Sequence, residues 1–246
     1  MDDAAARMAA EIAIARDVQA RLLPQAVPSL RSLELAARCI QASSVGGDYY
    51  DFLALGGDQT GFVLADVSGK GVHAALRMAN LHAHIRSQTA SAPQDPLRVL
   101  RHVNRMLIES WPSGHFATLF FGVYNDASRR LTYINCGHNP ALCLRHDGQI
   151  EWLRATATVL GAFDDWSCEL GRMPMAPGDR LVAYSDGVTE AVRDGQHFGE
   201  ERLVEVIRSQ PEASPEETIS ALLGRVQEFS GGELSDDLTL LVARAR

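Results

Sequence analysis

The stretch VGGDYYDF, residues 45–52, places two aspartates next to a glycine pair, and LADVSGKG, residues 64–71, again sets an aspartate close to glycine. An aspartate at the end of a strand is a short, stiff side chain on a rigid support, and an adjacent glycine lets a ligand approach closely. The chain repeats this arrangement at four places, namely Asp48, Asp66, Asp186 and the pair Asp236 and Asp237.

A bound cation would explain carboxylates that converge from separate strands, because such carboxylates otherwise repel one another. Hard carboxylate oxygens are the ligands that Mg²⁺ and Mn²⁺ prefer. Taken singly, an aspartate beside a glycine is more often a turn residue. The joint pattern argues against simple turns, since three of the four stretches set an apolar strand directly against the aspartate. The sequence therefore predicts a divalent-metal site built at strand ends.

The composition excludes several other classes of protein. A formal net charge of −8 argues against a nucleic-acid-binding surface, which would be basic. No apolar run approaches the ~20 residues that span a bilayer. The N-terminus, MDDAAARMAA, lacks the cationic start and apolar centre of a secretory signal. The four cysteines show no CxxC spacing, so we expect reduced thiols in a cytoplasmic protein with no nucleic-acid or membrane partner.

Residues 1–28 differ in composition from residues 29–246, and we treat them as an N-terminal helical segment that precedes a single domain. Up to Leu23 the chain is rich in Ala and Arg and contains no Gly or Pro, and Pro24 then breaks the pattern. Its apolar residues recur with helical spacing and predict an amphipathic helix with a polar interruption at Gln19. The stripe consists of Met8, Ile12, Ala15 and Leu22.

Beyond residue 28 the strands cluster and the helices cluster, without regular βαβ alternation. This order favours an α+β sandwich over a doubly wound parallel sheet. Helices are expected at 71–87, 96–110, 199–209 and 214–229. Strands are expected at 33–40, 49–55, 61–67, 179–187 and 236–246, with a meander of strands across 116–153.

Eight stretches together resemble the bacterial SpoIIE/RsbU-type serine phosphatases, a branch of the metal-dependent type 2C (PPM) protein phosphatases. The resemblance runs from about Arg16 to the C-terminus. It implies an αββα sandwich of two antiparallel sheets flanked by helices, with metal ions at one edge. The stretches are RDVQARLLP, VGGDYYDF, LADVSGKGVHAALRMA, FATLFFGVYN, INCGHNPALCL, GDRLVAYSDGVTEA, FGEERL and SDDLTLLVARAR.

Carried over residue by residue, the resemblance implies two Mn²⁺ or Mg²⁺ ions. Asp48 would bridge them, Asp66 and the carbonyl of Val67 would serve the first, and Asp186 and Asp236 would serve the second. Asp237 is the lesser candidate of its pair, because the family places the metal contact on the first position. Two such ions would activate a water for in-line attack on phosphorus, so that no covalent enzyme intermediate is needed.

Other motifs leave alternatives open. The sequence SGKG does not match a P-loop, but Lys70 opens a predicted helix and is either a phosphate contact or a solvated turn residue. His138 lacks ligand spacing and is expected to fix its loop through hydrogen bonds. No arginine directly precedes GGD to grip a phosphate, and the nearest is Arg38.

The sequence therefore predicts a cytoplasmic, metal-dependent protein serine/threonine phosphatase. The resemblance implies a phosphorylated STAS-domain protein, an anti-sigma-factor antagonist, as substrate. It also implies an upstream sensor or regulator and a homodimer formed through the N-terminal helix. Two alternatives are a pseudophosphatase that binds a partner without turnover, and a hydrolase of small phosphate esters. The intact aspartate set argues against the first alternative.

Overall fold

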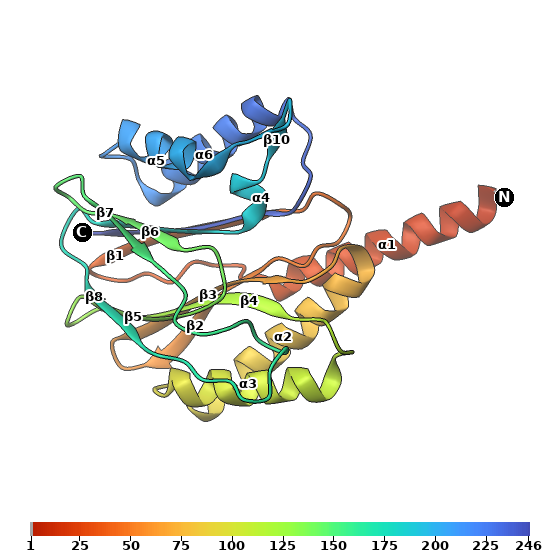
Figure 1. Cartoon of the computed structure of the whole chain (residues 1–246), viewed down its shortest axis with the longest axis horizontal. Helices are drawn as coiled ribbons and strands as arrows, with labels where there is room; N and C mark the ends of the chain where they lie inside the picture. The colour runs from red at the N-terminus through yellow and green to blue at the C-terminus, as the bar shows by residue number, and fades with distance from the viewer. Residues whose placement is uncertain (1) are drawn as a thin grey trace.

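Two antiparallel sheets pack face to face, and helices cover both outer faces, in a computed structural model that describes residues 2–246 (Figure 1). The first sheet has the strand order β1 (Leu33–Ile40), β12 (Leu238–Ala245), β9 (Arg180–Tyr184), β6 (Ala141–Leu144) and β7 (Ile150–Leu153). The second has the order β2 (Tyr49–Gly56), β3 (Gln59–Val67), β4 (Ala117–Asn125), β5 (Arg130–Cys136) and β8 (Gly171–Pro174).

Each sheet carries one pair of long helices on its outer face (Figure 1). The pair on the second sheet is α2 (Gly71–Ser91) and α3 (Pro96–Ser110), and the pair on the first is α5 (Gly199–Ser209) and α6 (Pro215–Ser230). The layer order helix, sheet, sheet, helix confirms the predicted αββα sandwich. Shorter elements complete the chain, namely α4 (Asp186–Thr189), β10 (Val192–Arg193) and β11 (Gln196–His197).

Three apolar cores separate these four layers. Strand β3 shows how they arise, since successive side chains of a strand point to opposite faces. Phe62 and Leu64 point into the core between the sheets, whereas Val63 and Ala65 point into the core beneath α2 and α3. A strand buried on both faces reads as a continuous apolar run, which explains the sequence GFVLADV.

The helix boundaries follow from capping chemistry. Ser214 and Glu217 form the reciprocal capping box that opens α6, as the sequence predicts. At the start of α3, the Asp95 side chain accepts a hydrogen bond from the amide of Arg98, and Pro96 occupies the first turn, where its missing N–H has no consequence.

The predicted meander across residues 116–153 is wrong. Strands β4 and β5 pair within the second sheet, but β6 and β7 belong to the first. The chain changes sheets after Gly137, which has a positive φ of 64°. Strand-forming residues do not specify which sheet a strand joins. The very short elements β8, β10, β11 and α4 also lacked a clear periodic signal.

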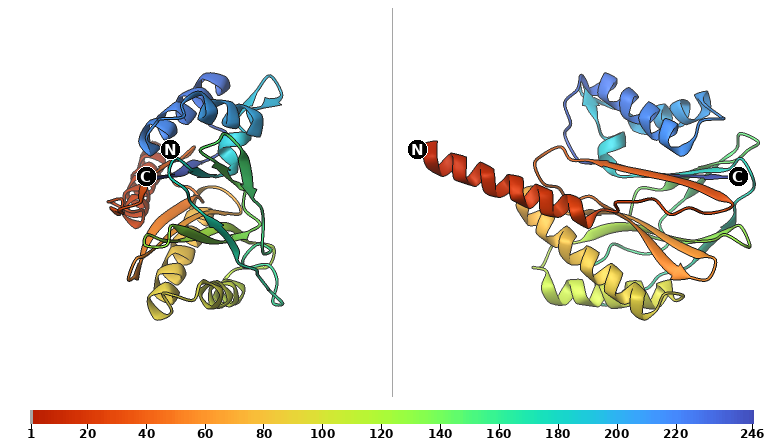
Figure 2. Two further views of the ribbon diagram at one scale, coloured as in Figure 1. Left: turned by 90° about the vertical axis from the view of Figure 1, so that its left-hand side faces the viewer. Right: turned by 180° about the vertical axis from the view of Figure 1, so that it is seen from behind.

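The N-terminal helix α1 (Asp2–Leu22) has two environments along its length. Its second half lies against the start of α2, while its first half extends beyond the body of the protein (Figures 1 and 2). Met8 is 64% exposed, whereas Gln19 is buried. The helical prediction is confirmed, and no helix in residues 2–246 is at once long and apolar enough to cross a membrane.

Candidate metal site

The aspartate-bearing strand ends meet at one edge of the sandwich because their strands are antiparallel. In the first sheet, the end of β1 pairs with the start of β12, where Ile40 faces Leu238, and Leu240 of β12 faces Tyr184 at the end of β9. In the second sheet, Tyr49 at the start of β2 faces Ala65 near the end of β3. Asp48, Asp66, Asp186 and Asp236 each lie at or close to one of these strand ends.

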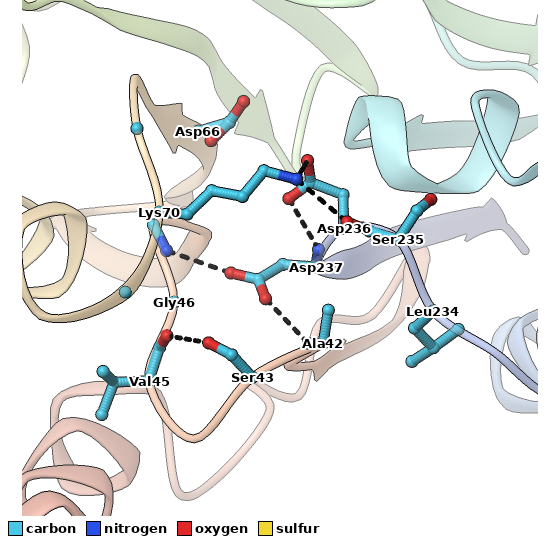
Figure 3. A pocket seen from close by; sticks show the side chains of 13 residues that line it. Ala42, Ser43, Val45, Gly46, Asp66, Lys70, Leu234, Ser235, Asp236 and Asp237 are labelled. Atoms are coloured by element: carbon cyan, nitrogen blue, oxygen red, sulfur yellow. Dashed lines mark hydrogen bonds and ion pairs between the residues drawn. The ribbon is translucent and has the colours of Figure 1, made fainter.

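A cavity of about 420 Å³ opens at this edge (Figure 3). It lies between the loop that precedes β2, the end of β3 with the start of α2, and the loop that precedes β12. Its polar lining includes Asp66, Lys70, Asp236 and Asp237, and its floor includes Gly46 and Gly47. Residues far apart in the sequence therefore share one pocket, as the strand-end pattern predicts.

Asp66 is the carboxylate that faces most of the others. Burial raises its pKa to about 7, and the negative charges of Asp186, Asp236 and Asp237 add to this shift. The nearby ammonium of Lys70 opposes the shift. A carboxylate surrounded by like charges holds a proton more tightly until a cation neutralises the group.

Asp48 directly precedes β2 and is only 3% exposed. Its Oδ2 accepts a 2.5 Å hydrogen bond from the Thr239 hydroxyl on β12. Burial raises the pKa of Asp48 well above its usual range, and the charge of Asp66 raises it further. The Thr239 hydroxyl fixes the carboxylate in orientation and tethers the two sheets at the site.

Asp186 and Asp236 approach from the first sheet. Asp186 is half-buried at the start of the short helix α4, immediately after β9. Burial raises the pKa of Asp186, and the charge of Asp236 raises it further. The Asp236 side chain is 41% exposed at the cavity mouth, and its Oδ1 accepts a hydrogen bond from the amide of Asp237. These two carboxylates therefore interact with each other across the gap between α4 and the β12 loop.

Asp237 holds the loop that leads to Asp48. Its Oδ1 accepts a hydrogen bond from the amide of Ala42 at 2.9 Å, and its Oδ2 accepts one from the amide of Gly47 at 3.0 Å (Figure 3). A Cβ at Gly46 would lie 1.8 Å from the Asp237 Oδ2. The glycine pair is therefore required by this close approach of backbone and carboxylate.

Gly47 also packs against the end of β3. A Cβ at this position would lie 2.7 Å from the carbonyl oxygen of Val67, the backbone oxygen that the family resemblance assigns to a metal. Any side chain at this position would clash with that carbonyl, so one of the two segments would have to move. Glycine at position 47 thus permits the close packing of this loop on the end of β3.

Lys70 reaches across the mouth of the cavity. Its Nζ lies 2.7 Å from Asp236 Oδ2 and donates a hydrogen bond to the Ser235 carbonyl at 2.9 Å (Figure 3). The hydrogen bond to Asp236 raises the pKa of the Lys70 ammonium. The lysine precedes α2 and is the only one in the chain.

Other residues singled out in the sequence lie outside the cavity. Asp51 is fully buried and accepts two hydrogen bonds from Arg86, one to each oxygen at 2.7 Å, so it fastens α2 to β2. Arg38 pairs with Glu216 on the face that carries α6. His138 is buried, and its Nδ1 lies 2.7 Å from the Thr118 hydroxyl, in agreement with a role in fixing its loop.

Two residues at the site were missed by the sequence analysis. Arg77 on α2 is half-buried, and its Nη1 would lie 3.8 Å from a Cβ at Gly69, which lines the cavity. Gln19 on α1 donates to the Gly46 carbonyl at 2.7 Å and accepts from the Gly46 amide at 3.1 Å. Gln19 had the visible signal, since it is the polar residue that interrupts an apolar stripe.

The donor set fits divalent cations. Four aspartates and one backbone carbonyl offer hard oxygen ligands, and three of the carboxylates show pKa values raised by burial and by each other's charge. Among the side chains of residues 5–246, no three acidic, histidine or cysteine groups lie close enough together to form a ready cation cage. Binding of an ion would therefore bring the aspartate side chains closer to one another.

Comparison with known proteins identifies the family. The family model described as Stage II sporulation protein E (SpoIIE) matches residues 56–246. Phosphoserine phosphatase RsbU of Bacillus subtilis is 30% identical over 96% of this chain and 70% of its own length. Phosphoserine phosphatase RsbP of the same organism is 26% identical over 73% of this chain and 45% of its own length.

Solved structures share this fold. The SiaA-PP2C domain of Pseudomonas aeruginosa superposes with a TM-score of 0.88 over 99% of both chains, at 20% identity. The catalytic domain of the serine/threonine phosphatase PstP, solved with two manganese ions, gives a TM-score of 0.63 at 20% identity over 87% of this chain and 98% of that one. The chain belongs to the SpoIIE/RsbU-type branch of the PPM (PP2C-type) phosphatases.

Proposed function

We propose that this chain is a metal-dependent protein serine/threonine phosphatase. The observation that carries the proposal is that the strand ends bearing Asp48, Asp66, Asp186 and Asp236 converge on one edge of the sandwich, where Asp66 and Asp236 line a cavity of about 420 Å³. Carboxylates that raise one another's pKa are stable as anions only when a cation shares the site. A non-catalytic interaction module, the pseudophosphatase alternative, has no need for this arrangement.

In this proposal two Mn²⁺ or Mg²⁺ ions would be held by Asp48, Asp66, the Val67 carbonyl, Asp186 and Asp236. The expectation that Asp48 is shared by the two ions, which the family resemblance implies, stays a prediction, and the charges of Asp186 and Asp236 act together on the neighbouring Asp66 carboxylate. Such ions lower the pKa of bound water and neutralise phosphoryl oxygens.

The remaining polar residues would position these groups and the substrate. The Thr239 hydroxyl would hold the Asp48 carboxylate in a fixed orientation as a ligand. Asp237 and the glycine pair hold the loop close to the Val67 carbonyl. Lys70 at the cavity mouth and Arg77 close to Gly69 are the cations that we assign to a substrate phosphate, since no arginine directly precedes GGD.

The substrate in this proposal is a phosphorylated STAS-domain protein in a bacterial partner-switching pathway. Support comes from the similarity to RsbU, whose name gives it as a phosphoserine phosphatase, and from a solved Mycobacterium tuberculosis chain that combines RsbU and RsbW domains. That structure is 26% identical, with a TM-score of 0.80 over 92% of this chain and 63% of its own. We further propose that an upstream regulator acts through residues 1–28 and that α1 can pair with a second copy, in the cytoplasm.

A phosphate-release assay tests the function. The protein is stripped with EDTA and supplied with Mn²⁺, and a phosphoserine STAS protein is compared with p-nitrophenyl phosphate and a nucleotide at equal phosphate concentration. We expect hydrolysis of the phosphoprotein only with the metal present, and at least tenfold loss for Asp66→Asn. Hydrolysis that continues in EDTA would exclude the metal-dependent mechanism. Turnover of the small esters alone would favour the small-ester hydrolase.

A further inference from the structure

Lys70 joins the two sides of the cavity mouth. Its backbone precedes α2 on one side, and its Nζ contacts Asp236 Oδ2 at 2.7 Å and the Ser235 carbonyl at 2.9 Å on the other. The side chain is 69% exposed and makes no capping hydrogen bond to α2. Both of these polar partners belong to the loop before β12, so the start of α2 does not depend on the lysine side chain.

The ammonium is placed where the local charge is most negative. Asp66, Asp186 and Asp236 lie around it, and the first two have raised pKa values because of burial and mutual repulsion. Asp236 and Asp186 both raise the pKa of Lys70 in turn. One positive charge thus offsets part of an excess of negative charge that would otherwise be uncompensated.

A divalent ion bound through Asp236 must compete for the same oxygen. An ammonium at 2.7 Å from Oδ2 occupies the approach that a metal ligand bond would use, and two cations at that distance from one oxygen repel each other. Binding of the ion therefore includes a step in which the Lys70 side chain leaves Asp236. Its exposed, flexible stem can make this movement without disturbing the core.

We propose that Lys70 is a tethered cation that competes with a divalent ion for Asp236 and thereby sets the affinity of the metal position that Asp236 serves. This rests on the proposed function, since it assumes that Asp236 is a metal ligand. It differs from a phosphate contact, because the effect exists without any substrate. It also differs from an ordinary surface ion pair, because removing the lysine strengthens binding of another cation.

The test is a titration of the full chain, stripped of metal, with Mn²⁺ by isothermal calorimetry in the absence of phosphate. Lys70→Met removes the charge and keeps an unbranched stem, and Lys70→Arg is the matched control that keeps the charge. We expect the weakest Mn²⁺ site of Lys70→Met to bind about 3- to 10-fold more tightly than the parent's, the range expected for loss of a partly exposed ion pair. Lys70→Arg should stay within about twofold of the parent, since it retains the competing charge.

Thermal melting gives a second readout. In EDTA, Lys70→Met should melt at a lower temperature than the parent, because the carboxylates lose their internal counter-charge. At saturating Mn²⁺ the difference should shrink or reverse. Unchanged or weaker Mn²⁺ binding by Lys70→Met overturns the inference while leaving the phosphatase proposal intact. An equal gain in Mn²⁺ affinity by Lys70→Arg also overturns the inference, because the gain would not then come from loss of the charge. A parent that binds no Mn²⁺ overturns both proposals.

Discussion

At the scale of single residues, two aspartates three positions apart, Asp48 and Asp51, lie in opposite electrostatic surroundings. Asp48 is buried beside Asp66 with one hydroxyl partner, and its pKa is raised, first by burial. Asp51 is buried with Arg86, the Tyr49 hydroxyl and a backbone amide, so its charge is compensated. The sequence DYYD gives both the same appearance, and only the fold separates the proposed metal ligand from the structural residue.

This contrast predicts opposite effects on the stability of the metal-free protein. Asp48→Asn removes a charge that the fold disfavours, and should stabilise the stripped protein at pH 7 by about 1 kcal/mol. Asp51→Asn leaves Arg86 without its partner and should cost about 1–3 kcal/mol, since half of the arginine side chain remains in solvent. Urea unfolding in EDTA measures both. If Asp48→Asn destabilises the stripped protein as much as Asp51→Asn, charge repulsion does not limit the stability of the empty site.

The raised pKa of Asp66 predicts a pH-dependent metal affinity. Its folded value of about 7 lies above the ordinary 3.8, so folding takes up a proton between roughly pH 4 and pH 7. The metal-free protein should therefore lose stability as pH rises through this window. A cation needs the deprotonated carboxylate, so Mn²⁺ affinity should rise with pH and level off above about pH 7. Calorimetry in buffers of different ionisation enthalpy would count the released protons, and Asp66→Asn should flatten the profile. A Mn²⁺ affinity independent of pH between about 5 and 7 would contradict this role for Asp66.

At the scale of elements, local patterns identified most helices and strands but not their partners. Strand β1 occupies the predicted residues 33–40, and α3 and α5 also begin and end as predicted, because periodicity and caps are local signals. The sheet change between β5 and β6 was missed, because pairing is decided by packing that no short window records. Short sequence patterns are limited in the same way at the proposed metal site. Glycine next to aspartate indicated where the ligands lie, whereas the contacts of Lys70, Arg77 and Gln19 come from tertiary packing.

Helix α1 reaches the site through one polar side chain. Gln19 binds both backbone groups of Gly46, and its Oε1 also accepts from Gln41 at 2.7 Å. The Asp237 carboxylate holds the same loop from the other side through the amide of Gly47. The position of α1 is therefore mechanically connected to the loop that packs on the Val67 carbonyl.

Gln19→Ala should loosen this loop. We expect a higher Mn²⁺ concentration for half-maximal activity, by roughly threefold or more, and about 1–2 kcal/mol lower stability, because buried backbone groups of Gly46 lose their partners. Gln25→Ala is the matched control, since the exposed Gln25 side chain donates to the carbonyls of Ala20 and Leu23 at the C-terminal end of the helix rather than to the site loop. The two variants should differ in Mn²⁺ activation measured with one substrate. Equal activation curves for Gln19→Ala and the parent would mean that the contact is only structural.

At the scale of the whole molecule, the sandwich explains why the proposed metal site lies at an edge of the two sheets. It also explains how contacts on the protein surface can change the geometry of that site. Each sheet is rigid, since each is covered on both faces by apolar cores. The loops that carry Asp48, Lys70 and Asp236 lie between the sheets' ends, where a small shift of one sheet changes the distances among carboxylates. Helices α1 and α2 are the elements that lead from this edge to the protein surface (Figure 2).

The exposed first half of α1 predicts self-association. The apolar stripe begins at Met8, which is 64% exposed, and ends at Leu22, which packs on the protein's own core, while Gln19, which interrupts the stripe, is buried. A helix extending beyond its domain gains no stability from the core along that length, and isolated helices of this size are marginal in water. A second copy that covers Met8 and Ile12 would stabilise this first half of the helix. Replacing both with glutamate should then lower the mass seen by light scattering from dimer to monomer.

Ile14→Glu is the matched control for this pairing, because Ile14 is equally exposed at 64% but lies about 120° away from Met8 around the helix. The variant with glutamate at positions 8 and 12 should lose the dimer, while the Ile14 variant keeps it, since only the former places charge within the shared apolar stripe. A parent that is monomeric at concentrations well above those of the assay would exclude pairing through α1 and leave its first half as a connection to another protein.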